Sequence, residues 1–153
     1  MNLIKKIVLV TGGFDPLHSG HIHLFNNAAK LGYKLIVGLN SDEWLIRKKG
    51  FCLMPLSERR IIIENLKMIY AIVLWDDSDN TANGAIKKIL RDMKQEEVLI
   101  FANGGDRTKA NIPEILMYEK NDSIQFVFGV GGSKKQNSSS QIIHNYNKNF
   151  KKK

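Results

Sequence analysis

Short apolar runs rich in β-branched residues alternate along the chain with longer segments in which apolar residues recur at helical spacing. The runs are continuous rather than alternating, which is typical of strands buried on both faces. The expected strands are Lys6–Thr11, Lys34–Leu39, Tyr70–Trp75, Val98–Ala102 and Ile124–Phe128. The expected helices are His21–Leu31, Ser41–Lys48, Ser57–Met68, Asn83–Lys94, Pro113–Lys120 and Ser139–Tyr146.

This alternation of strands and helices predicts an α/β fold. Strands joined by helical crossovers pair in parallel, and the crossovers are right-handed. We therefore expect a Rossmann-like open parallel sheet of five strands with helices on both faces, in a single domain. Ligands of such sheets bind at the carboxyl ends of the strands, so the loops after the strands are where a site is expected.

Composition places the chain among soluble globular proteins, with 43% hydrophobic and 25% charged residues. No apolar run reaches the roughly 20 residues of a membrane span, and none near the N-terminus resembles a signal peptide, so we expect a cytoplasmic protein. The net charge is +8, but four lysines lie in the last six residues. We predict a domain over 1–147, a basic disordered tail over 148–153, and neither a nucleic-acid nor a membrane partner.

The loop after the first expected strand combines glycines with two histidines. Gly12 and Gly13 carry no Cβ, so a ligand can approach their backbone closely. His18 and His21 stand three residues apart at the start of a helix and so share one face. Beside the free N–H groups of a helix N-terminus, such a pair suits phosphate oxygens. The alternatives are a histidine that caps the helix or packs in the core, a solvated pair, or a metal site.

Gly13-Phe14-Asp15-x-x-His18-x-Gly20-His21 resembles the G-x-F-D-x-x-H-x-G-H signature of the cytidylyltransferase-like nucleotidyltransferases. Ser41-Asp42-Glu43, Arg47-Lys48-Lys49-Gly50 and Ser57-Glu58-Arg59-Arg60 extend the resemblance to glycerol-3-phosphate cytidylyltransferases and to the adenylyltransferases that make ADP-heptose. The resemblance implies transfer of a nucleoside monophosphate from a nucleoside triphosphate to a small phosphorylated polyol, sugar or amino alcohol, with release of pyrophosphate.

The same resemblance implies roles for individual residues. His18, His21 and Lys48 or Lys49 are the expected catalytic residues. The acceptor is expected to contact Arg59 and Arg107. The expected nucleotide-binding residues are Thr11, Gly12, Gly13, Phe14, Asp15, His18, His21, Asn103, Gly105, Asp106, Lys134, Lys135, Ser138, Ser139 and Ser140. Asp15 is either a turn residue or a group that orients the site or its metal. Mg²⁺ is expected with the triphosphate, held by phosphate oxygens and water rather than by a protein cage.

The loop before the last expected helix also resembles a segment of this family. Ser138, Ser139 and Ser140 match the S-T-T part of R-T-x-G-I-S-T-T, where hydroxyls open a helix and meet the β- and γ-phosphates. The arginine of that segment is missing because Ser133 takes its place, and Lys134 or Lys135 would supply the charge.

The nucleotide and the oligomeric state are further expectations. The first loop and Ser41-Asp42-Glu43 favour CTP, whereas Asn103-Gly104-Gly105-Asp106 resembles the loop of the heptose-phosphate adenylyltransferases and supports ATP with a sugar phosphate as the alternative. A nucleotide-binding module without catalysis is disfavoured because both histidines occur together with the downstream hydroxyls. Relatives of this kind are commonly dimers, so a homodimer is expected.

Overall fold

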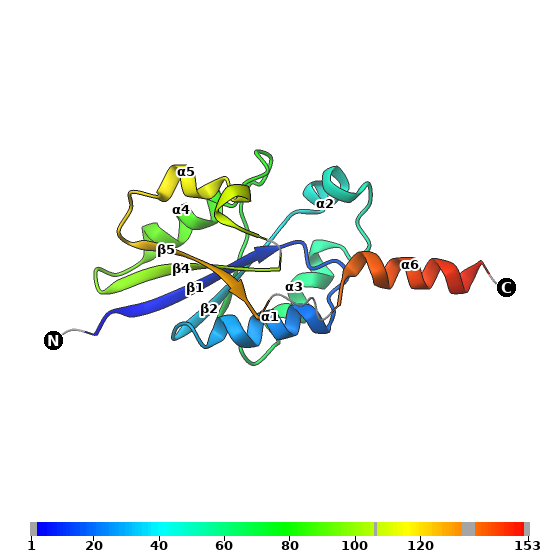
Figure 1. Ribbon diagram of the computed structural model, residues 1–153, viewed down its shortest axis with the longest axis horizontal. Helices are drawn as coiled ribbons and strands as arrows, with labels where there is room; N and C mark the ends of the chain where they lie inside the picture. Colours follow the sequence, from blue (N-terminus) through cyan, green and yellow to red (C-terminus); the bar gives the residue numbers. More distant parts are fainter. Residues whose placement is uncertain (1–2, 106, 133–136, 152–153) are drawn as a thin grey trace.

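A parallel sheet of five strands forms the centre of the molecule, with helices on both faces (Figure 1). The computed structural model describes residues 3–105, 107–132 and 137–151. The strands are β1 (Lys5–Gly12), β2 (Lys34–Leu39), β3 (Ala71–Val73), β4 (Glu97–Gly104) and β5 (Ile124–Val130). Their order in the sheet is β3-β2-β1-β4-β5, and every neighbouring pair is parallel. The predicted open parallel sheet is confirmed.

The helices follow the expected order, with differences at their ends. They are α1 (Ser19–Ala29), α2 (Asp42–Lys49), α3 (Leu56–Glu64), α4 (Asn83–Asp92), the 3₁₀ turn η1 (Lys109–Asn111), α5 (Glu114–Tyr118) and α6 (Ser139–Phe150). Strand β3 is half as long as expected, and η1 has no counterpart among the expected elements. Because α6 continues to Phe150, the expected tail over 148–153 begins inside a helix.

The sheet buries both faces, as its continuous apolar runs predict. On β1, Val8 and Val10 contribute to one core cluster, and Ile7 and Leu9 contribute to the other, because successive side chains of a strand point to opposite faces. Helices α1 and α3 cover the first cluster, and α4 and α5 cover the second (Figure 1).

The chain reverses its direction across the sheet at β1. Strands β2 and β3 lie on one side of β1, and β4 and β5 lie on the other. At such a switch point the loops after neighbouring strands diverge and leave a crevice at their carboxyl ends. Helix α6 buries none of its residues and extends away from the sheet (Figure 1). Within the described residues, no helix combines the length and the hydropathy that crossing a membrane requires.

Candidate active site

A cavity of about 300 Å³ opens where β1, β4 and β5 end, between the starts of α1 and α6. Most of the expected nucleotide-binding residues line it: Thr11, Gly12, Gly13, Phe14, His18, His21, Asn103, Gly105, Ser138 and Ser139. Asp15 and Ser140 do not line it. Asp106, Lys134 and Lys135 lie outside the described residues. The structure thus brings together residues from three separate loops, those after β1, β4 and β5.

The two histidines occupy the start of α1 and hold each other in place. His18 is the N-cap residue, and its Nδ1 accepts a hydrogen bond from the Gly20 amide at 3.0 Å. The His18 amide in turn donates to Nδ1 of His21 at 3.3 Å. The two rings stack with their centroids 3.7 Å apart. Since each Nδ1 is an acceptor, the proton of each neutral ring is on Nε2, which is left to donate to a ligand.

The surroundings keep both imidazoles neutral. Burial first, and then the neighbouring His18 and Lys49, together lower the pKa of His21 to about 3. Burial and Lys49 also lower the pKa of His18. At neutral pH the pair therefore offers two Nε2–H donors rather than positive charges. His18 thus caps the helix, which was one of the alternatives that the sequence left open, and it also lines the cavity.

Glycines make room for this arrangement. A Cβ on Gly20 would lie 2.8 Å from Cε1 of His18 and 3.2 Å from the Asn137 amide nitrogen, closer than packed atoms approach. A Cβ on Gly12 would lie 3.0 Å from the ring of Phe14, which itself packs edge-on against His21 with centroids 5.0 Å apart. The spacing of glycines and aromatic residues in this loop therefore reflects the space that the imidazoles need.

Asp15 ties the first loop to the segment before α3. Its carboxylate is buried and accepts hydrogen bonds from the amides of Leu53 and Met54, each at 2.7 Å. Its carbonyl accepts a hydrogen bond from Lys49 Nζ at 2.8 Å. Both carboxylate oxygens are thus occupied by backbone donors, which fits the orienting role rather than that of a metal ligand.

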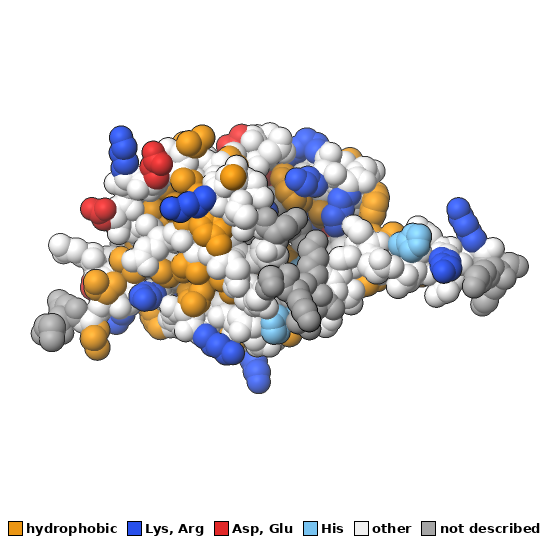
Figure 2. All heavy atoms as spheres, viewed as in Figure 1, with side chains coloured by type: hydrophobic (Ala, Val, Ile, Leu, Met, Phe, Trp, Pro, Cys, Tyr) orange, Lys and Arg blue, Asp and Glu red, His pale blue; other side chains and the backbone are white. Residues whose placement is uncertain are grey.

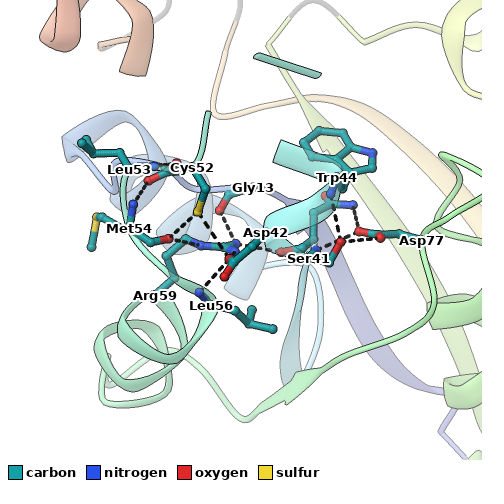
Figure 3. A network of polar contacts seen from close by, with 12 residues as sticks. Gly13, Ser41, Asp42, Trp44, Cys52, Leu53, Met54, Leu56, Arg59 and Asp77 are labelled. Carbon is teal, nitrogen blue, oxygen red and sulfur yellow. Dashed lines mark hydrogen bonds and ion pairs between the residues drawn. The ribbon is translucent and has the colours of Figure 1, made fainter. Parts of the chain in front are cut away.

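Arg59 lies under the site rather than in it (Figure 3). Its side chain is 0% exposed, and its guanidinium donates to the carbonyls of Gly13, Asn40 and Met54, each at 2.8 Å. It also pairs with Asp42 at 2.6 Å. Arg59 does not line the cavity. The expectation that Arg59 binds the acceptor's phosphate does not fit this geometry, because its donors already hold the loops together.

A second cavity, of about 580 Å³, is lined by residues that follow β2 and β3 and by residues of the segment after β4. Thr11 and Arg107 line both cavities, so they mark the place where the two meet. Lys48 also lines the second cavity, with its Nζ 5.7 Å from the centre of the Trp44 ring. Figure 2 shows Lys and Arg side chains gathered over α2, whose last turn carries Arg47, Lys48 and Lys49.

Asp77 supports the wall of the second cavity. Its carboxylate accepts a hydrogen bond from the Asn40 side chain at 3.0 Å. It also accepts hydrogen bonds from the amide and hydroxyl of Ser41 at 2.8 and 2.7 Å (Figure 3). The guanidinium of Arg47 donates to the Asp77 carbonyl at 2.8 Å. This network joins the ends of β2 and β3 and presents the basic turn of α2 to the cavity.

The start of α6 closes the first cavity. Ser138 is its N-cap, and the hydroxyl oxygen accepts from the Gln141 amide at 3.1 Å, which leaves the hydroxyl proton for a ligand. Ser139 donates its hydroxyl to the Pro16 carbonyl at 3.0 Å and so ties α6 to the first loop. Ser140 is exposed and lines neither cavity. Of the three expected serine hydroxyls, that of Ser138 is therefore the one that can donate to a ligand in the cavity.

The described lining of the first cavity contains imidazoles, amides and hydroxyls but no carboxylate. No group of three or more His, Cys, Asp and Glu side chains that could hold a metal ion occurs among the described residues. Such a lining fits a Mg²⁺ ion that arrives with a triphosphate and keeps phosphate oxygens and water as its ligands.

Several lining residues were not identified from the sequence. Asn40, Arg47, Trp75 and Glu114 line the second cavity, and His23 lines the first. Asn40 directly follows β2 and Trp75 lies just beyond β3, so proximity to a strand's carboxyl end was the available signal. Glu114 and His23 lie on helices, and no local pattern distinguishes them from surface residues.

Comparison with known proteins places this site in a family. The family described as Cytidylyltransferase-like matches residues 9–145. The "Bifunctional protein HldE" of Actinobacillus succinogenes is 36% identical over 120 residues, which are 70% of this chain and 25% of that protein. The protein of the same name from Citrobacter koseri is 36% identical over 115 residues, 67% of this chain and 24% of that protein. The chain thus spans about a quarter of the length of these relatives.

Solved structures share the fold. The crystal structure of the lipopolysaccharide core biosynthesis protein from Thermoplasma volcanium superposes with a TM-score of 0.62 at 24% identity, over 87% of this chain and 99% of that one. The NadR protein in complex with NR superposes with a TM-score of 0.54 at 16% identity, over 97% of this chain and 40% of that one.

Proposed function

We propose that this chain, which belongs to the cytidylyltransferase-like family of nucleotidyltransferases, transfers AMP from ATP to a small phosphorylated sugar and releases pyrophosphate. The observation that carries the proposal is the pair of stacked, neutral imidazoles, which place two Nε2–H donors on the wall of a cavity bounded by the N-termini of α1 and α6. Donors and helix N-termini of this kind favour a chain of phosphates.

The chemistry is an in-line displacement at the α-phosphorus. An oxygen of the acceptor's phosphate forms a bond to the α-phosphorus, and the bond from this phosphorus to the oxygen bridging to the β-phosphate breaks. The bridging oxygen leaves with the electron pair as part of pyrophosphate. His18 and His21 donate from Nε2 to the oxygens of the α-phosphate, where negative charge builds up in the transition state. Bound Mg²⁺ would neutralise part of the charge of the triphosphate.

The two cavities divide the substrates between them. The first, with the histidines and Ser138, takes the nucleoside triphosphate, and the second, with Lys48, takes the acceptor. Arg107 lines both, so its guanidinium is placed to bind oxygens of the acceptor's phosphate and of the α-phosphate together. Holding both phosphates at one junction supplies the proximity that this displacement requires.

The positions of the motif residues support ATP rather than CTP as the nucleotide. Ser41 and Asp42, which supported a cytidylyltransferase from the sequence, cap α2 and hold Arg59, and neither lines the first cavity. Asn103 and Gly105, from the loop that resembles adenylyltransferases, do line it. Of the two features that favoured CTP, Ser41-Asp42-Glu43 therefore supports the fold, and the first loop, which does line the cavity, carries the signature of the whole family. Asn103 and Gly105, also on the wall of this cavity, favour ATP. The HldE relatives support the same choice.

Pyrophosphate release would test this function directly. The full chain would be assayed with Mg²⁺ and each of ATP, CTP, GTP and UTP, against phosphorylated sugars, polyols and amino alcohols, and the products identified by mass spectrometry. We expect sustained turnover with ATP and one sugar phosphate, and loss of turnover in the double variant His18→Asn, His21→Asn. Turnover with CTP alone would replace the adenylyl assignment by a cytidylyl one. Nucleotide binding without turnover over the whole panel would support a module without catalysis.

A further inference from the structure

Glu114 is a buried carboxylate on the wall of the second cavity. It is the first residue of α5, is 3% exposed, and reaches across to the start of α4. There its Oε1 accepts a hydrogen bond from the Ala82 amide at 2.6 Å, and Ala82 is the N-cap residue of α4. One carboxylate oxygen thus replaces the side-chain cap that α4 lacks.

The other oxygen of this carboxylate, Oε2, has no protein partner. Among the described side chains, Asn83 Oδ1 and Glu114 Oε2 are the buried polar atoms without a hydrogen bond, and of these two residues only Glu114 lines a cavity. A carboxylate oxygen that is withdrawn from water and unpaired is costly, so native proteins generally supply a donor. Because Glu114 lines the second cavity, a molecule bound there would be in a position to supply the donor for Oε2.

The charges around the cavity restrict what this donor can be. Arg47, Lys48 and Arg107 also line the cavity, so it attracts the phosphate of an acceptor. The same cations oppose a positively charged donor, and the carboxylate of Glu114 repels the phosphate itself. A neutral hydroxyl group on the non-phosphate part of the acceptor meets both conditions.

We propose that Glu114 Oε2 accepts a hydrogen bond from a hydroxyl of the acceptor, and that this contact selects hydroxyl-bearing phosphate esters over simple ones. The inference rests on the proposed function, because it assigns the second cavity to the acceptor. It adds a residue that recognises a hydroxyl on the acceptor's carbon skeleton, whereas the basic residues bind only the acceptor's phosphate. A buried carboxylate oxygen discriminates strongly between substrates with and without the hydroxyl, since an analogue that lacks it leaves the oxygen without a hydrogen bond.

The test compares hydroxyl-bearing and hydroxyl-free probes on matched variants. Glucose 1-phosphate, mannose 1-phosphate and glycerol 3-phosphate carry hydroxyls, and methyl phosphate carries none. Glu114→Gln keeps an oxygen for the Ala82 amide and replaces the other carboxylate oxygen by an amide donor. Glu119→Gln removes an exposed carboxylate just beyond the end of the same helix and serves as the control. Binding to the full chain would be measured by calorimetry, with thermal melting as a check on folding.

We expect the wild type to bind the best hydroxyl-bearing probe at least about tenfold more tightly than methyl phosphate. Glu114→Gln should abolish this preference without weakening the binding of methyl phosphate or of ATP, which a purely structural role of Glu114 would not produce. Glu119→Gln should behave as the wild type. Equal affinity of the wild type for all four probes would overturn the inference, and so would a preference that survives in Glu114→Gln. The wild-type comparison keeps the inference falsifiable even if Glu114→Gln fails to fold.

Turnover separates this inference from the proposed function. If the wild type binds the hydroxyl-bearing probes selectively but no pair of substrates releases pyrophosphate, the transfer reaction is refuted and the role of Glu114 stands. If a sugar phosphate turns over with the same KM in the wild type and in Glu114→Gln, the role of Glu114 is refuted and the reaction stands.

Discussion

Replacing His21 by Asn is expected to make the folded chain less sensitive to acid. Burial first, and then His18 and Lys49, lower the pKa of His21 from 6.5 to about 3 in the folded protein. The unfolded chain therefore binds a proton on this residue near pH 6.5, whereas the folded chain does not until about pH 3. Protonation of His21 therefore does not lower the free energy of unfolding above pH 6.5, and it lowers this free energy progressively as the pH falls from 6.5 towards 3.

The size of the effect follows from these two values. Each pH unit below the unfolded pKa costs about 1.4 kcal/mol of free energy of unfolding, and pH 4 lies about 2.5 units below it. Because the ring is only partly buried, we expect about 2 to 3 kcal/mol to be lost between pH 7 and pH 4 through His21. Asn at this position keeps an oxygen for the His18 amide but cannot take up a proton in this range.

Urea denaturation at pH 7 and at pH 4 would measure the loss. The wild type should lose about 2 to 3 kcal/mol more than His21→Asn over this interval, beyond any constant difference between the two proteins. His144→Asn, which changes an exposed histidine on α6, is the control and should lose as much as the wild type. Equal losses in the wild type and in His21→Asn would refute the assignment of a neutral, partly buried imidazole at this position.

Other substitutions test the packing of the site and the division of the cavities. Gly20→Ala should lower kcat/KM by about tenfold or more with little change in melting temperature, because its Cβ displaces the His18 ring, while Ser19→Ala next to it should have no effect. Arg59→Lys should lower the free energy of unfolding by about 3 kcal/mol, since an ammonium cannot reach three carbonyls and Asp42 at once. In the same urea titration, the control substitution Arg60→Lys, at an exposed position, should change this free energy by less than about 0.5 kcal/mol. Arg107→Lys should lower kcat/KM by about tenfold or more and leave unfolding unchanged; activity like that of the wild type would remove Arg107 from the junction of the substrates.

The elements and their order were predictable from the sequence because they depend on local periodicity. The continuous apolar run of β1 reports burial on both faces, and the core clusters on either side of this strand confirm it. The first loop was also predictable as a site, since Gly12, Gly13, His18 and His21 lie within ten residues at the end of a strand. These four residues line one cavity in the structure.

The roles of the arginines were decided by tertiary structure alone. In the sequence, Arg59 lies near the start of an expected helix and Arg107 follows the fourth expected strand, and both were expected to bind the acceptor. The fold wraps three backbone carbonyls around Arg59 and leaves Arg107 facing both cavities. Which charge remains free for a ligand depends on contacts between segments far apart in the chain, and no local pattern records them.

The second cavity shows most clearly which features the sequence determines and which depend on tertiary structure. Its wall joins Asn40 after β2, Trp75 after β3 and Glu114 on α5, whose carboxylate becomes a cap for α4 only when the two helices meet. The sequence determines which segments become strands and helices, because hydrophobic burial acts on each segment's own pattern. Only the folded chain determines which polar atoms are satisfied by other segments and which remain for a ligand, because a hydrogen bond requires two groups to meet within about 3 Å.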